Sequence, residues 1–477
     1  MTQAAAVVCA TMTQISQDHQ QAHHGYLLFD AIEKKPGLCW HFKRKGFCNL
    51  GNTCKFFHPE SLQKQQTSEV ATCSKRLAYW VCRAKEENSA TSVLRRTFEE
   101  NGFAMIVLKT EDVEKRYYTA VYWGNAFPYN NLKHIPSYTY INHFSNSHQL
   151  TNKSLLTLNF QQVNQGTIQF KSQFIPPSFS LPMQMDLFMN HVNKQGDCIW
   201  IVKPAGSGEG RGINLYSCMR DAIIGEYPEV SLDEINGLKI EDATMKKIKK
   251  RRLVICKYVQ KPLLIDERKF DMRLYVLAVG DGRVYLYKDG IVRIASEKYS
   301  ESNDTLSNFY IHITNNTVNN KKNHFVNEKT KRTFGFFNNM NLAELEEYLE
   351  SKSLHFHVFW DRLRSLVSES IKLTLFNPDK ADPKFEQYKN RCFEVLGYDV
   401  LVDADLNPYL LEVNSMPDLS GVSQSNHLVL EKDFDVKSKM LAGALNLVGV
   451  QLADPSVEAE NLSSVFVEDL EYFERIL

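Results

Sequence analysis

CFEVLGYDVLVDADLNPYLLEVNSM (Cys392–Met416) contains two apolar runs on either side of a polar segment, residues 403–408, that ends in proline. This pattern predicts two antiparallel strands joined by a turn. Side chains alternate between the two faces of a strand, so each predicted strand presents a polar set on one face. The two sets are Asp399, Leu401 and Asp403 on the first strand, and Leu410, Glu412 and Asn414 on the second.

If these two polar sets face the same way, Asp399, Glu412 and Asn414 bring three oxygen-bearing side chains to one patch. Oxygen ligands without Cys or His suit Mg²⁺, which usually takes one or two carboxylates and completes its shell with water and substrate phosphates. The alternative is a solvated strand face. Against it, Glu412 lies within an apolar run, where an idle carboxylate would be costly to bury.

The composition indicates an ordinary globular protein of 477 residues, 43% hydrophobic and 23% charged. Its formal net charge is zero, so binding to nucleic acid or a membrane would need a local patch. Three of the ten cysteines lie in one short motif and the others are scattered, which does not indicate a disulfide scaffold in a chain this long. No apolar run approaches the roughly 18 residues of a membrane span, and the N-terminus lacks the basic segment of a signal peptide. We therefore expect a cytosolic protein without a membrane partner.

After a polar segment, 1–35, that we expect to be disordered, residues 36–60 contain a predicted zinc site. Cys39, Cys48, Cys54 and His58 have a C-x8-C-x5-C-x3-H spacing. Three thiolates and one imidazole fill a closed tetrahedral Zn²⁺ site, and the metal would supply much of the folding free energy of so short a segment. The motif resembles the CCCH zinc fingers.

The residues around the zinc ligands allow two interpretations. Several aromatic and basic side chains, among them Phe42, Phe47 and Lys43, could stack on bases and contact phosphates of single-stranded RNA. Alternatively, the aromatic residues form the small core of a finger that docks on protein. Residues 61–75 are polar and predict a linker to the main domain, 76–450.

A second motif, GDCIWIVKPAGSGEGRGINLYS (196–217), predicts a strand, a Gly-rich loop and another strand. Lys203 ends the apolar strand, and glycines at 206, 208, 210 and 212 would let backbone N–H groups approach phosphate. The loop lacks the Gly-Lys-Ser/Thr of a Walker loop and does not fit a dinucleotide fingerprint. A flexible surface hairpin is the alternative. The basic run MKKIKKRR (245–252) that follows is either a solvated helix face or a surface for an acidic partner.

Residues 269–300 predict antiparallel strands with turns at Gly280-Asp281-Gly282 and Lys288-Asp289-Gly290. Period-two alternation places Lys269, Asp271 and Arg273 on one face, and Arg293 lies on the next strand. Two arginines beside a metal site suit capture of carboxylate or phosphate, whereas the alternative is a surface ladder of ion pairs.

Helical spacing extends from Leu342 to about Phe376 and recurs in DVKSKMLAGALNLVGV (435–450). We interpret the first region as scaffold and the second as a closing amphipathic helix. Residues 451–477 are acidic, and we expect a loose tail there.

The combination IVKPAGSGEGRGI, CKYVQKPLLI, RKFDMRLYVL, GIVR, ITNN and CFEVLGYDVLVDADLNPYLLEVNSMP, in this order, resembles the tubulin–tyrosine ligase-like family from about Arg76 to about Val450. The resemblance implies an α+β fold of the ATP-grasp type, with ATP between two α+β lobes, to which this chain adds the small zinc finger. It also implies ligation of an amino acid to a protein carboxylate.

The resemblance assigns roles to individual residues of this chain. Those that would contact ATP are Lys203, Ser207, Gly208, Gly210, Arg211, Gly212, Lys257, Tyr258, Val259, Lys269, Asp271, Thr314 and Asn315. The implied Mg²⁺ ligands are Asp399, Glu412 and Asn414, which agrees with the prediction from strand alternation. The implied catalytic residues are Lys203, Arg273, Arg293 and Glu412. The positions where the family binds the incoming amino acid and phosphate are Lys269, Asp271, Arg273 and Arg293.

The predicted function is therefore ATP-dependent ligation of an amino acid to tubulin or another acidic protein through an acylphosphate. Glutamate is the expected amino acid, because its addition is the commonest activity among such sequences. The expected location is the cytoplasm, at the cytoskeleton or in a cilium. Glycine or tyrosine as the donor stays open. The second hypothesis is an RNA-binding zinc-finger protein whose ligase domain is ancillary or modifies a protein other than tubulin.

Overall fold

The computed structural model of the chain describes residues 76–81, 92–100, 103–108, 120–319, 339–419, 431–450 and 470–477, apart from positions 131, 133–134, 136, 165–166 and 209. The expected disordered segment 1–35, the predicted zinc finger at 36–60 and the linker at 61–75 lie outside the described residues. The same holds for the zinc ligands Cys39, Cys48, Cys54 and His58.

The largest sheet of the described residues has seven strands and carries the predicted hairpin. Its main path runs β14-β13-β12-β15-β16, with β11 paired to β12 and β17 to β13. The strands are β11 (Leu264–Ile265), β12 (Arg268–Val279), β13 (Val284–Ile294), β14 (Asn339–Asn341), β15 (Phe393–Val402), β16 (Pro408–Asn414) and β17 (Phe473–Arg475). The antiparallel pairing of β15 with β16 confirms the hairpin predicted from residues 392–416.

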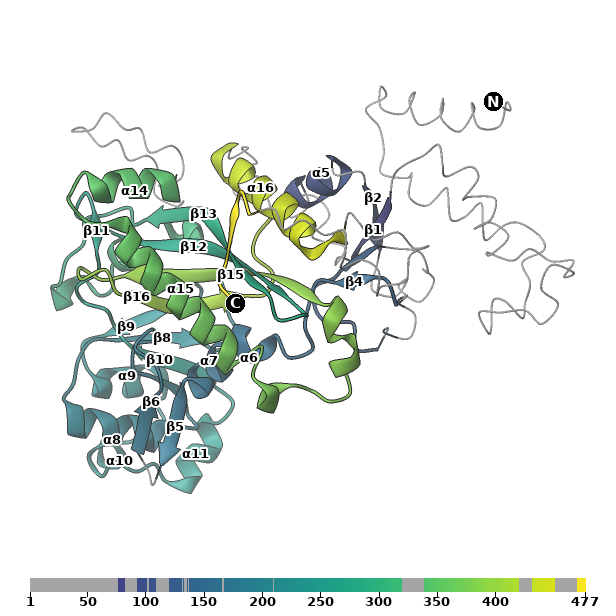
Figure 1. Cartoon of the computed structure of the whole chain (residues 1–477). Helices are drawn as coiled ribbons and strands as arrows, with labels where there is room; N and C mark the ends of the chain where they lie inside the picture. The colour runs from purple at the N-terminus through teal and green to yellow at the C-terminus, as the bar shows by residue number, and fades with distance from the viewer. Residues whose placement is uncertain are drawn as a thin grey trace, which may run out of the picture.

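Helices cover both faces of this sheet (Figure 1). Even-numbered residues of β12, such as Met272 and Val276, pack with α14 (Leu342–Glu350) and α15 (Phe356–Leu373). Odd-numbered residues from Tyr275 onward pack with α5 (Ser92–Glu100) and α16 (Glu431–Val448). The earlier odd-numbered residues of β12 are charged, so the second face is a core at one end and polar at the other.

A second lobe is built on a four-stranded antiparallel sheet of order β7-β10-β8-β9. Its strands are β7 (Ser178–Leu181), β8 (Trp200–Pro204), β9 (Asn214–Tyr216) and β10 (Leu253–Lys257). A separate hairpin comprises β5 (Gln161–Asn164) and β6 (Thr167–Phe170). The helices of this lobe are α8 (Met185–Gln195), α9 (Met219–Glu226), α10 (Leu232–Asn236) and α11 (Asp242–Ile248). Two helices that precede it, α6 (His148–Thr151) and α7 (Lys153–Asn159), bury Leu150 and Leu156 in the core of the large sheet.

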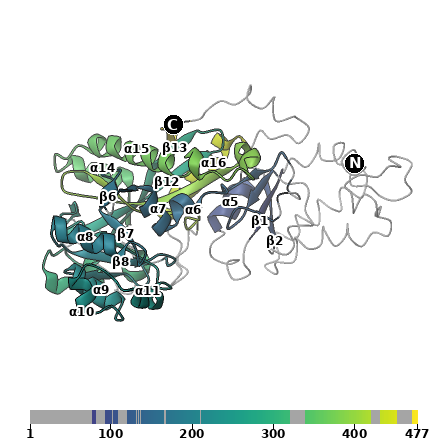
Figure 2. The same ribbon diagram turned by 90° about the horizontal axis from the view of Figure 1, so that it is seen from below.

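A parallel sheet of order β2-β1-β3-β4 lies at the opposite end of the large sheet from this lobe, as the view from below shows (Figure 2). Its strands are β1 (Arg76–Val81), β2 (Phe103–Leu108), β3 (Val121–Trp123) and β4 (Tyr140–Ile141). The remaining short elements are α12 (Phe309–His312), α13 (Asn316–Asn319), η5 (Asn303–Thr305), η6 (Pro378–Lys380) and η7 (Glu386–Arg391). Sheets and helices mixed in this way confirm the predicted α+β class. None of the described helices is long and apolar enough to cross a bilayer.

The second predicted turn, at Lys288-Asp289-Gly290, is wrong. β13 continues through these residues, and its register against β12 shifts between Leu274 and Val276, so the extra residues form a bulge. A Cβ at position 290 would approach the Arg273 carbonyl oxygen at 2.8 Å, which explains a glycine there without a chain reversal. The first turn is confirmed, because β12 and β13 pair on either side of residues 280–283.

The structure also bears on the two predicted helical regions and the predicted C-terminal tail. The region from Leu342 to Phe376 is two helices, because the chain turns at Ser353, whose φ is +58°. Both helices direct apolar residues to the same core, so the hydrophobic spacing continues across the turn. The closing helix is confirmed as α16. The end of the expected tail is ordered instead: β17 pairs with β13, and Phe473 is buried against it.

Candidate active site

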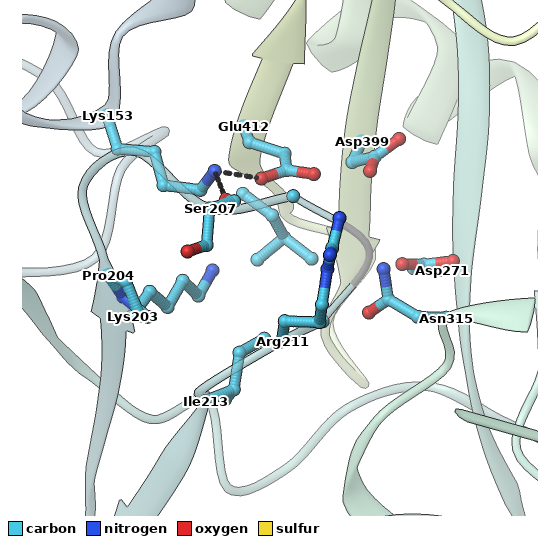
Figure 3. Close-up of a pocket in the computed structure, with 13 residues that line it drawn as sticks. Lys153, Lys203, Pro204, Ser207, Arg211, Ile213, Asp271, Asn315, Asp399 and Glu412 are labelled. Carbon is cyan, nitrogen blue, oxygen red and sulfur yellow. Dashed lines mark hydrogen bonds and ion pairs between the residues drawn. The ribbon is translucent and has the colours of Figure 1, made fainter. Parts of the chain in front are cut away.

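The Gly-rich segment connects β8 to β9 and forms one wall of a pocket. Lys203 lies on β8 opposite Val254, one residue before the strand ends, and its side chain points into the pocket (Figure 3). Gly210 has a φ of +73°, and a Cβ there would come within 3.3 Å of Asn315. Glycine at this position therefore allows both the left-handed backbone and the close approach to Asn315.

The opposite wall is the β15–β16 hairpin. Asp399 pairs with Glu412 in the antiparallel register, so the two carboxylates lie side by side as predicted. The next pair is Val400 with Leu410, which leaves Leu411 as an extra residue. This bulge corrects one prediction: Leu410 does not share a face with Glu412 but packs in the core, whereas Leu411 lines the pocket.

Two arginines and two aspartates form a buried ion network behind the pocket. Arg273 donates to both Asp399 oxygens, at 2.5 and 3.1 Å. Arg293 donates to both Asp271 oxygens at 2.7 Å, and it also lies 3.1 Å from Asp399. Gly397 permits this packing, because a Cβ there would come within 3.2 Å of Arg273 Cδ. The network is not the surface ladder of ion pairs that the sequence left open, since the exposed fraction of Asp399 is only 2%.

The network sets the protonation of its members. Burial alone would raise the pKa of Asp399, but the guanidinium groups of Arg273 and Arg293 hold it well below its ordinary value. Burial opposes the charge on Arg293, yet Asp271 and Asp399 raise its pKa above the ordinary value. Asp399 and Arg293 are therefore charged at neutral pH.

Lys153, at the start of α7, is a site residue that the sequence analysis missed. Its Nζ donates to the Ser207 carbonyl at 2.9 Å and lies 2.8 Å from Glu412 Oε2 (Figure 3). It thus connects the Gly-rich segment to the acidic hairpin. The lysine precedes the Gly-rich segment by about 50 positions and stands in the irregular stretch NSHQLTNKSLL. No local pattern in that stretch indicates a site.

Nine of the predicted residues line this one pocket: Lys203, Ser207, Gly208, Gly210, Arg211, Asp271, Asn315, Asp399 and Glu412. Together with Lys153 and the two arginines behind, the site contains five cationic and three acidic side chains. An excess of fixed positive charge beside clustered carboxylates suits a polyphosphate and a divalent cation, and does not resemble a solvated strand face.

A second set of predicted residues forms a chain of hydrogen bonds beside the pocket. Lys269 Nζ donates to the Tyr258 hydroxyl and to the His312 carbonyl, both at 3.0 Å. The Tyr258 hydroxyl lies 3.0 Å from His312 Nδ1, and Nε2 of this histidine lies 3.1 Å from Thr305 Oγ1. Burial lowers the pKa of Lys269 to about 7, with Asp271 raising it and Lys203 lowering it further. Burial and Lys269 lower the pKa of His312 to about 4.

The other predicted residues do not line the pocket. Arg273, Arg293, Lys269 and Tyr258 are in the two networks above. Gly212 adjoins the pocket on the Gly-rich segment, and Thr314 is buried next to Asn315. Val259 is half-buried, while Lys257 is exposed at the end of β10 and lies close enough to His191 to lower the pKa of that histidine. Asn414 follows Glu412 on β16 and pairs with Gly397.

The residues proposed for Mg²⁺ were tested against the described structure. Asp399 and Glu412 are adjacent, and Nδ2 of Asn414 is a buried polar atom without a hydrogen-bond partner. Nδ2 is a hydrogen-bond donor and cannot ligate a cation, so Asn414 could hold Mg²⁺ only through Oδ1. The two adjacent carboxylates, which both line the pocket, are the part of the set that fits the metal. No group of three or more His, Cys, Asp or Glu side chains suited to a metal occurs among the described residues. The proposed Mg²⁺ set has only two carboxylates and one amide, so this absence does not count against it.

The pocket lies where the two α+β lobes meet, and its lining suits a polyphosphate. Comparison with known proteins gives the family: the model of the tubulin-tyrosine ligase family matches residues 130–449, more than half of the chain. The chain belongs to the tubulin–tyrosine ligase family, so the recognition made from the sequence motifs is confirmed at that level, together with the ATP-grasp-like α+β fold.

Individual relatives are similar over most of this chain. It is 27% identical to tubulin polyglutamylase TTLL5 of Mus musculus over 85% of the chain and 28% of the relative. It is 30% identical to tubulin monoglutamylase TTLL4 of Mus musculus over 70% of the chain and 25% of the relative. It is 28% identical to tubulin polyglutamylase TTLL7 of Homo sapiens over 76% of the chain and 38% of the relative. The chain thus spans well under half the length of these relatives.

Proposed function

We propose that this protein is an ATP-dependent ligase that joins glutamate to a carboxylate of tubulin through an acylphosphate. One observation carries the proposal: the acidic β15–β16 hairpin and the Gly-rich segment meet in one pocket that contains Lys153, Lys203 and Arg211. Family membership supports ligation with ATP and Mg²⁺. The names of the relatives, which are tubulin polyglutamylases and a monoglutamylase, support tubulin as the acceptor and glutamate as the donor.

In this proposal ATP occupies the space between the two lobes. The Gly-rich residues Ser207 to Gly212 and Lys203 hold its phosphates, and residues 257–259 provide backbone beside the adenine. Lys269, Asp271, Thr314 and Asn315 complete the nucleotide site. Asp399, Glu412 and Asn414 hold Mg²⁺, which when bound neutralises phosphate charge and orients the transferred group.

The chemistry proceeds in two balanced steps. An acceptor carboxylate oxygen attacks the γ-phosphorus, the bond to ADP breaks, and an acylphosphate forms. The neutral amine of glutamate then attacks the acyl carbon, inorganic phosphate leaves, and the amine loses a proton as the amide forms. A free carboxylate resists amine attack at neutral pH, which is why phosphorylation must come first.

The chain's own residues would contribute position and charge. Lys203 and Lys153 stabilise the negative charge that develops on the transferred phosphoryl group. Arg273 and Arg293 hold the carboxylates of the donor and the phosphate, and their ion pairs with Asp271 and Asp399 keep the guanidinium planes fixed. Glu412 is paired with Lys153 in the structure and would give up this ion pair when it binds the metal.

Incubation of the purified chain with ATP, Mg²⁺, tubulin and isotope-labelled glutamate, glycine or tyrosine tests the proposal by mass spectrometry. We expect an ATP-dependent mass increase of tubulin with glutamate alone. Incorporation of glycine or tyrosine instead would change the donor, and no incorporation of any of the three would reject tubulin ligation. We expect the protein in the cytoplasm, at microtubules or cilia, which fluorescence microscopy with a microtubule marker would test.

The predicted zinc finger is a separate proposal. Cys39, Cys48, Cys54 and His58 would hold one structural Zn²⁺, and the finger would bind single-stranded RNA or dock on a protein. Zinc analysis of wild type and Cys54→Ser, followed by RNA crosslinking of both, tests it. One bound zinc and a crosslink that the variant loses would support RNA binding, and zinc without a crosslink would leave protein docking.

A further inference from the structure

The basic run at residues 245–252 has a defined place beside the pocket. Residues 245–248 form the end of α11, and residues 249–252 connect it to β10. Arg252 accepts a backbone hydrogen bond from Ala205 N at 3.1 Å, and Leu253 pairs with Pro204, which lines the pocket. The cationic turn is thus adjacent to the first residue of the Gly-rich segment.

Lys246, Lys247, Lys249, Lys250 and Arg252 all have exposed side chains, and we call these five residues the basic surface. Among the described residues, Arg251 is in an ion pair, with its Nη2 2.6 Å from Glu226, and none of these five is. Clustered like charges repel one another and do not stabilise a fold. In the described part of the chain, the cluster therefore presents positive charge to solvent without a direct ion pair.

A structural role explains only part of this charge. Lys246 and Lys247 are in the last turn of α11, where cations interact favourably with the helix dipole. Lys249 is the C-cap residue of α11 and also lies at this end of the dipole, whereas Lys250 and Arg252 lie beyond the helix. The helix dipole thus accounts for three of the five cations.

The backbone beneath the basic surface is fixed. Lys249 N donates to the Met245 carbonyl at 3.1 Å, and Arg251 N donates to the Ile248 carbonyl at 3.0 Å. The Tyr227 hydroxyl donates to the Arg251 carbonyl at 2.7 Å. The cations are therefore presented from an ordered turn, and less conformational entropy is lost when a charged partner binds.

We propose that the basic surface docks an acidic polypeptide segment and leads its acceptor carboxylate into the pocket. This inference rests on the proposed function, because it concerns how the protein acceptor reaches the site. A polypeptide is favoured over nucleic acid, since the run contains no aromatic side chain on which bases could stack. Its position next to Ala205 would deliver the segment to the phosphate side of the site.

Fluorescence anisotropy with a labelled glutamate-rich peptide, without ATP, tests the docking on the full chain. We compare wild type with Lys246→Glu/Lys247→Glu/Lys249→Glu/Lys250→Glu. A matched control changes the same charge elsewhere on exposed lysines: Lys171→Glu/Lys194→Glu/Lys372→Glu/Lys384→Glu. A version of the first variant with Gln in place of Glu, and thermal unfolding of all proteins, identifies any loss of folding.

We expect the first variant to bind the peptide at least about tenfold more weakly, the Gln version to lose affinity to a smaller extent, and the control to stay within about twofold of wild type. Wild-type affinity should also fall as salt rises from low to physiological concentration. Unchanged binding by the first variant, equal losses in both variants, or tighter binding of single-stranded oligonucleotide to the same surface would each overturn the proposal.

The ligation assay separates this inference from the proposed function. A raised KM for the protein acceptor in the first variant, with KM for ATP unchanged, supports docking. Normal acceptor KM in that variant would reject docking and leave the ligase intact. Peptide binding that depends on the basic surface, in a wild-type protein that ligates nothing, would reject the ligase and leave docking.

Discussion

Glu412→Gln should abolish ligation while leaving the fold intact. In the structure Glu412 has one strong partner, Lys153, at 2.8 Å, and both side chains are about one-sixth exposed. Glutamine keeps the volume and can still accept the hydrogen bond from Lys153, which also retains the Ser207 carbonyl. For a partly exposed pair we expect a loss of about 1 kcal/mol in the free energy of unfolding at most, or about 1 °C in Tm for a chain of this length.

The expected loss of activity is much larger, because the substitution removes a charge at the point where we place Mg²⁺ and the transferred phosphate. Loss of one preorganised electrostatic group at a reacting centre typically costs on the order of 10²–10³ in kcat. Scanning calorimetry and ATP-dependent incorporation of labelled glutamate, measured on the same preparations, give both quantities. Turnover near the wild-type rate would refute the role of Glu412, and a large drop in Tm would show that its part is structural.

Three further predictions concern the neighbouring residues. Asp399→Asn should lower the free energy of unfolding by about 3–5 kcal/mol in chemical denaturation, because Arg273 and Arg293 would be left buried without full counter-charge; a change below 1 kcal/mol would contradict the network. Lys153→Ala should reduce kcat at least tenfold with Tm within a few degrees, and unchanged kinetics would exclude it from the site. Because Lys269 has a pKa of about 7 and only its charged form attracts phosphate, ATP affinity measured by calorimetry should fall as pH rises from 7 to 9, by up to about tenfold per unit. Lys269→Met should remove that slope, and a slope retained in the variant would contradict the assignment.

Strand alternation in Cys392–Met416 was enough to predict the pairing of Asp399 with Glu412, because one buried face fixes the register of a hairpin. Strand alternation gave the wrong face for Leu410, which belongs to the next pair of the hairpin. The bulge at Leu411 reverses the facing of Leu410, and a bulge depends on the packing of both strands. The turn predicted at Lys288-Asp289-Gly290 was wrong for a similar reason. The glycine is needed there because β12 approaches closely, and the chain does not reverse.

Charged residues could be placed on a face but not paired from sequence. Alternation put Lys269, Asp271 and Arg273 together, yet it could not show that Arg273 pairs with Asp399, 126 positions away. Lys153 gave no signal, because its partners are a backbone carbonyl and a carboxylate from two distant segments. Such contacts are products of tertiary packing, and local periodicity does not contain them.

The central claim is that the acidic hairpin and the facing cations together bind a metal–nucleotide complex. Isothermal titration of the purified chain with the non-hydrolysable ATP analogue AMP-PNP, with and without Mg²⁺, tests this most directly. The account predicts one site per chain with micromolar affinity that depends on Mg²⁺, and a loss of that Mg²⁺ dependence in Glu412→Gln. Binding that ignores both the metal and the substitution, or no binding at all, would contradict it.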